Sequence, residues 1–138
     1  QLIIGIISFW TLGSQLQNPQ AESRETTEEM ESDQKPVTNI DVTQLAIVDI
    51  LAGSSAQGNP DYDPQELVVK KDNVGIIWIN KDNVPHTVTS LKDDGKSFDS
   101  SIIMGNANYT LLLSDLKEKQ YDYFCTIHPY MKAKFQIE

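Results

Sequence analysis

The 138-residue chain is poor in the residues that mark several common protein classes. It has one cysteine, so no disulfide can form within the chain, and the sulfur is left as a free thiol, a catalytic thiolate or a metal ligand. Only 11 basic residues stand against 20 acidic ones, and the net charge of −9 argues against nucleic-acid binding, which needs a basic face. No stretch keeps a helical apolar period over three turns. These shortages exclude a disulfide scaffold, a nucleic-acid binder and a helical bundle.

Long apolar runs are also missing. Residues 2–13 are mostly apolar, but a membrane-spanning helix needs roughly 20 such residues. A signal-peptide core or a clipped anchor suits residues 1–16 better, with a strand or a surface-covering patch as the alternative. Residues 17–36 carry six acidic and two basic residues and predict a flexible acidic linker. This order predicts that a domain over residues 37–138 works outside the cytoplasm, secreted or anchored to the membrane.

The predicted domain consists of short apolar runs separated by turn residues. Seven or eight strands within about 100 residues favour an all-β sandwich. Residues 74–80 form the strongest predicted strand, with Trp78 in the core, and residues 114–116 are expected to form one helical turn. In residues 86–90 an alternation predicts His86 and Val88 on one face and Thr87 and Thr89 on the other. Met104 is expected to pack near the loops. The remaining expected strands are residues 45–51, 67–70, 109–113, 120–125 and 132–137.

Every cysteine and histidine of the chain lies in one of two motifs. Residues 121–131 contain Cys125, His128 and Met131 with the spacing Cys-x2-His-x2-Met, and His86 follows Pro85 far upstream. A thiolate, two imidazoles and a thioether form a soft donor set. A trigonal plane of two histidines and a cysteine, with a weak axial methionine, is typical of an electron-transferring type 1 copper site.

Other metals suit these residues less well. Structural zinc sites want four strong ligands, and iron–sulfur clusters want several cysteines. Each residue alone is more often structural, as a buried thiol, a core histidine or a core methionine, but their joint spacing favours one copper ion. The positions also suit a rigid site, because His86 follows the strongest strand and Cys125 ends another.

Residues 76–88 and 121–131 resemble the two copper-binding segments of the cupredoxins, and most of all those of the plastocyanin/amicyanin branch. The resemblance implies an eight-stranded Greek-key β-sandwich that carries single electrons between redox partner proteins. It also implies that His86, Cys125 and His128 are equatorial copper ligands and that Met131 is the axial one. Residues 1–36 lie outside the resemblance.

The chain departs from the family pattern at two places. Many members have asparagine after the first ligand histidine, where this chain has Thr87. A hydrogen bond from the Thr87 hydroxyl to Thr126 is the expected replacement, joining the two ligand segments. The loop from Cys125 to Met131 is also short. If Met131 does not reach the metal, water occupies the axial position.

Four functions remain open from the residues. The first is an electron carrier that transfers through His128 within an apolar patch of Pro85, Ile127, Pro129 and Tyr130, and its negative charge favours a basic partner. The second is an open copper site whose axial water gives way to small molecules such as nitrogen oxides. A copper chaperone usually has Met-rich or CxxC sites, which this chain lacks. A thiol hydrolase needs a base and an orienting group beside Cys125.

Overall fold

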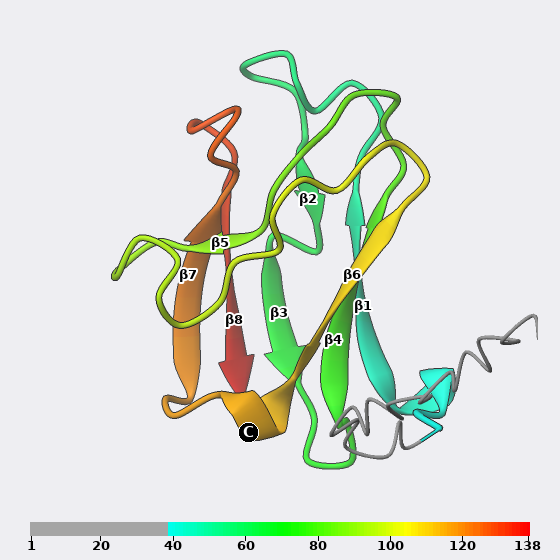
Figure 1. Cartoon of the computed structure of the whole chain (residues 1–138), viewed down its shortest axis with the longest axis vertical. Coiled ribbons are helices and arrows are strands. Elements are labelled where there is room, and N and C mark those ends of the chain that lie inside the picture. Colours follow the sequence, from blue (N-terminus) through cyan, green and yellow to red (C-terminus); the bar gives the residue numbers. More distant parts are fainter. Residues whose placement is uncertain (1–38) are drawn as a thin grey trace, which may run out of the picture. The chain divides into compact units, whose positions relative to one another are not determined.

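The computed structural model describes residues 39–138, which form two four-stranded β-sheets (Figure 1). The predicted apolar segment 1–16 and acidic linker 17–36 lie outside the described residues. Within residues 39–138, no helix has the length and apolar character needed to cross a membrane. The strands are β1 (Leu45–Ile50), β2 (Tyr62–Asp63), β3 (Glu66–Val69), β4 (Gly75–Asn80), β5 (Thr89–Ser90), β6 (Asn108–Leu112), β7 (Gln120–Phe124) and β8 (Lys132–Ile137).

The strands divide between the sheets in an order that differs from their order along the chain. One sheet has the order β2-β1-β4-β6 and the other β3-β8-β7-β5. Strand β1 pairs in parallel with β4, and β3 pairs in parallel with β8, while the remaining neighbours are antiparallel. The all-β prediction and the number of strands are confirmed. The expected helical turn is also present, as the short 3-10 helix η2 (Leu113–Asp115); a second one, η1 (Val42–Gln44), precedes β1.

The core lies between the sheets and is rich in aromatic side chains. Trp78 of β4 is fully buried, as predicted, and its ring stands edge-on to Tyr123 of β7, with the ring centroids 5.4 Å apart. Phe135 of β8 is 6.2 Å from the same indole. Each large apolar side chain removed from water contributes about 1.5–3 kcal/mol to folding. This packing fixes β4 and β7 relative to each other, and both strands lead into the predicted ligand segments.

The side chains of residues 86–90 alternate as expected, since the Thr87 and Thr89 hydroxyls lie 3.1 Å apart on one face of the segment. Both faces are buried, and only Thr89–Ser90 form a regular strand. Isolated bridges from His86 to Ile103 and from Thr89 to Asp99 cover the segment instead. The expectation for Met104 is wrong: it is 58% exposed, because the extended backbone there turns Ile103 inward and its neighbours outward.

The loops that follow β1, β4 and β7 lie at one end of the β-sandwich, its upper end in Figure 1. Strands β1 and β4 run in the same direction, so the loop of residues 51–61 lies beside the segment that leads to His86. Strand β7 ends at Phe124, directly before Cys125. The topology therefore gathers segments that are far apart in sequence.

Candidate metal centre

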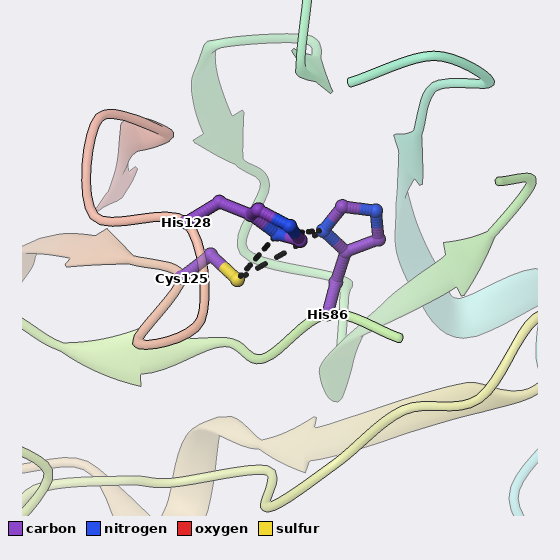
Figure 2. A group of neighbouring side chains, drawn as sticks. All are labelled: His86, Cys125 and His128. Atoms are coloured by element: carbon purple, nitrogen blue, oxygen red, sulfur yellow. Dashed lines mark hydrogen bonds between the residues drawn. The ribbon is translucent and has the colours of Figure 1, made fainter. Parts of the chain in front are cut away.

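Three of the predicted ligands place their donor atoms together. Cys125 Sγ lies 3.8 Å from His86 Nδ1 and 3.7 Å from His128 Nδ1, and the two Nδ1 atoms are 3.2 Å apart (Figure 2). Among residues 39–138, these three side chains form a group whose possible ligand atoms all lie within 4.8 Å of one another, close enough to hold one metal ion. Metal bonds to imidazole nitrogen and thiolate sulfur are about 2.0–2.3 Å long. Bonds of that length allow one ion to reach all three atoms.

The surroundings of the Cys125 sulfur favour its thiolate form. Burial raises the pKa of the thiol, but hydrogen bonds with His86, with the Thr87 N–H and with His128 outweigh burial and lower the pKa to about 6. The Thr87 N–H donates to Sγ at 3.3 Å. Because the thiolate is the form that binds metals, the side chain is ready for a soft cation at neutral pH.

His86 is completely buried, and both of its ring nitrogens have partners. Nδ1 faces Cys125 and His128, while Nε2 lies 2.9 Å from Asp82 Oδ2 and 3.2 Å from Ser54 Oγ. Burial lowers the pKa of His86, but the interactions with Cys125 and then Asp82 outweigh it and raise the pKa. Sequence reasoning missed Asp82 and Ser54. The spacing of Asp82 four residues before His86 was the available signal.

His128 has a more open environment. It is only partly buried, and its ring centroid lies 4.9 Å from that of His86 and 6.0 Å from that of Tyr130. Ile127 and Tyr130 beside it are 45% and 37% exposed, and Pro129 is exposed as well. One edge of the centre is therefore close to solvent and surrounded by apolar side chains.

Met131 ends the ligand loop and is fully buried. Its N–H donates to the His128 carbonyl at 2.9 Å, and its carbonyl accepts from the Cys125 N–H at 3.1 Å. These two bonds close a tight turn and hold Cys125, His128 and Met131 in a compact loop. The role of the Met131 sulfur as an axial ligand stays a prediction.

The expected link between the two ligand segments is present. The Thr87 hydroxyl oxygen accepts a hydrogen bond from the Thr126 N–H at 2.8 Å and lies 3.1 Å from the Thr126 hydroxyl. It also lies 3.1 Å from the Thr89 hydroxyl. Thr87 therefore joins the His86 segment to the Cys125 loop, and the hypothesis made from the sequence is confirmed.

Curated relatives of the chain are amicyanins. It is 28% identical to the amicyanin of Paracoccus versutus over 107 residues, which cover 76% of this chain and 74% of that protein. It is 32% identical to amicyanin-alpha of Methylorubrum extorquens over 68 residues, which are 49% of this chain and only 57% of that protein.

Solved structures show the same fold. A purple cupredoxin from Nitrosopumilus maritimus has a TM-score of 0.59 and 22% identity, with 67% of this chain and 99% of that chain covered. A single-residue variant of amicyanin in its reduced Cu(I) form at pH 4 has a TM-score of 0.51 and 27% identity, with 68% and 82% covered. The family model described as "Cupredoxin-like domain" matches residues 3–137. Because that match spans nearly the whole chain, the protein belongs to the cupredoxin-like family.

Proposed function

We propose that this protein carries single electrons on one copper ion bound by His86, Cys125 and His128, with Met131 as the axial ligand. The convergence of two imidazole nitrogens and one thiolate within 4.8 Å carries the proposal. Soft sulfur and imidazole donors in this ratio suit copper, and a solved structure of an amicyanin variant holds copper as Cu(I).

The surroundings of the centre suit electron transfer because they resist rearrangement. The copper ion supplies the one-electron change between Cu(II) and Cu(I), whose preferred geometries differ. His86 is fixed by burial and by Asp82, and the loop from Cys125 to Met131 is closed by backbone hydrogen bonds. Ligands held in this way move little when the oxidation state changes, so the barrier to transfer stays low.

Electrons would enter and leave through His128. Its partial exposure brings one ligand close to the surface, and the exposed Ile127, Pro129 and Tyr130 provide apolar contact area. Transient redox complexes have small interfaces, so a patch of this kind is sufficient. The net charge of −9 favours partner proteins with a basic docking surface and an association rate that falls with salt.

We place this activity outside the cytoplasm. The support is the sequence of residues 1–36, in which an apolar segment of signal or anchor type precedes an acidic spacer. Both a secreted and a membrane-anchored form agree with that order.

The test is the visible and EPR spectrum of the copper(II) protein, with and without Met131→Gln. We expect an intense thiolate-to-copper band in the wild type and a changed band pattern in the variant, because an amide oxygen replaces a thioether. Met104→Gln is the matched control, since Met104 is exposed, and it should leave the spectrum unchanged.

Addition of azide to the same samples separates the closed carrier from an open site. We expect no shift of the visible bands in the wild type, because a buried Met131 excludes small anions from the axial position. A clear azide shift in the wild type would favour an open copper site that reacts with small molecules such as nitrogen oxides. Absence of an intense band after copper loading would overturn the copper assignment itself.

A further inference from the structure

Asp82 is a buried carboxylate that touches a proposed metal ligand from the side opposite the metal. It is 4% exposed and lies in the segment between β4 and His86. Its two oxygens have different partners. Oδ1 accepts from the Gly53 N–H at 3.1 Å and from the Asn83 N–H at 2.9 Å, whereas Oδ2 faces His86 Nε2 at 2.9 Å. The carboxylate therefore connects the loop after β1 to the imidazole.

The contacts of the carboxylate show where His86 carries its proton. The other protein partners of the carboxylate are all donors, namely two backbone N–H groups at Oδ1 and the Ser54 hydroxyl at Oδ2. His86 Nε2, 2.9 Å from Oδ2, is placed as a donor in the same way. Metal binding through Nδ1 requires the same tautomer, because it uses the Nδ1 lone pair, which is directed toward Cys125 and His128.

Ser54 completes the arrangement from the loop after β1. Its hydroxyl is fully buried and donates to Asp82 Oδ2 at 3.4 Å, and its oxygen is 3.2 Å from His86 Nε2. The same loop accepts a hydrogen bond from the Tyr130 hydroxyl at the Ser55 carbonyl. The loop thus contacts both ligand segments, and Gly53, which has a φ of 81°, allows the turn that brings its N–H to Asp82.

We propose that Asp82 is a positioning residue that fixes His86 as an Nδ1 ligand and, through its buried negative charge, lowers the reduction potential of the copper. The inference rests on the proposed function. A nearby anion stabilises Cu(II) more than Cu(I), because Cu(II) carries one more positive charge, and the effect is larger in a buried site than in water. Carboxylates that accept from a ligand histidine orient the ring and increase its basicity.

Asp82→Asn is the informative substitution. An asparagine offers one oxygen and one amide group, so it can accept from the Gly53 and Asn83 N–H groups or from His86 Nε2–H, but not from both sides. We expect the affinity for Cu(II) to fall by about 10–100-fold, as is usual when the partner of a ligand histidine is removed. Each tenfold loss for Cu(II) beyond the loss for Cu(I) raises the reduction potential by about 59 mV.

Asp122→Asn is the matched control. It removes the same charge from β7, the strand that leads to Cys125, but Asp122 is exposed to solvent. Water and salt screen such a charge, so its removal should leave the potential unchanged. Equal shifts in the two variants would mean that total charge, rather than Asp82, sets the potential, and would overturn the inference.

The second measurement is the NMR signal of the imidazole protons in the diamagnetic copper(I) protein, and it needs no variant. We expect a slowly exchanging Nε2–H of His86 in the wild type. If His86 Nε2 carries no proton, or if Asp82→Asn keeps both this signal and the potential of the wild type, the inference is wrong although the carrier function stands. If the wild type binds no copper, the proposed function fails instead.

Discussion

The two histidines of the candidate centre have opposite environments. His86 is fully buried, and its remote nitrogen faces Asp82 and Ser54. His128 is partly exposed, and within residues 39–138 the hydrogen-bond partners of its imidazole ring all face Nδ1, and none faces Nε2. One ligand is therefore held from both sides by the protein, while the other is held only from the inner side.

This difference gives the two ligand histidines different roles. A ligand whose outer nitrogen is bonded inside the protein keeps its orientation and tunes the metal. A ligand whose outer edge approaches solvent gives a partner protein a short path to the metal. The fold explains the difference. One histidine lies in a segment covered by the loop after β1, and the other lies in an exposed turn between β7 and β8.

The largest expected effect on the visible spectrum comes from Cys125, whose sulfur lies next to the Nδ1 atoms of both histidines. The Cys125→Ser variant should lose the intense visible band completely, because the charge transfer that gives the colour needs a thiolate. The measurement is the absorption spectrum of the copper(II) protein at equal copper content. A retained intense band would contradict the assignment of Cys125 as a ligand.

Removal of each histidine in turn tests the comparison directly. We expect both His86→Gly and His128→Gly to lose most of the intense band, and added imidazole to restore it only in His128→Gly. A free imidazole can enter the gap that faces solvent, but the gap left by His86 is closed by Ser54 and Asp82. The measurement is a titration with imidazole followed by absorption.

The His86→Gly variant serves as the control in that experiment, since both proteins lose the same side chain. Equal recovery in the two variants would show that the buried histidine is as accessible as the exposed one. The contrast between the two environments would then be without functional meaning.

Acidification should affect the two histidines differently in the reduced state. Protons compete with metals for imidazole nitrogen, and they reach the partly exposed His128 more easily than the buried His86. Proton uptake by the Cu(I) state alone favours that state, so the reduction potential should rise as the pH falls, by at most about 59 mV per pH unit. Voltammetry over the mildly acidic range measures it, and a constant potential would contradict the prediction.

Much of this arrangement could be predicted from the sequence because its signals are local. The apolar runs around Trp78 and Tyr123 predicted β4 and β7, and the Cys-x2-His-x2-Met spacing with His86 predicted the group of donors that the structure brings together. The Thr87–Thr126 contact could be inferred from one departure from the family pattern.

The parts that sequence reasoning missed depend on long-range packing. Asp82 and Ser54 lie 28 residues apart, and they meet only because β1 and β4 run in parallel. Nothing in the local sequence of residues 51–59 distinguishes such a loop from an ordinary polar connection. The burial of residues 86–90 on both faces likewise depends on residues 99 and 103, which cross from another part of the chain.

The smallest expected effect concerns the link between the two ligand segments. Thr87→Ala removes the acceptor of the Thr126 N–H and the contacts with the Thr126 and Thr89 hydroxyls. Since each hydrogen bond contributes about 0.5–1.5 kcal/mol net, the free energy of unfolding should fall by about 1–3 kcal/mol, measured by urea unfolding of the copper protein. Thr43→Ala is the control, because Thr43 is exposed, and its effect should stay within about 0.5 kcal/mol.

Thr87→Asn distinguishes the hydrogen bond from simple packing. The asparagine amide oxygen can accept from the Thr126 N–H, so this variant should recover most of the stability that Thr87→Ala loses. Loss of the link should also loosen the Cys125 loop more than the His86 segment, because Asp82 and Ser54 still hold His86. Hydrogen exchange should therefore become faster at Thr126 in Thr87→Ala and stay unchanged at Asn83, whose N–H donates to Asp82. Faster exchange at both amides would show that the two segments are stabilised as one unit.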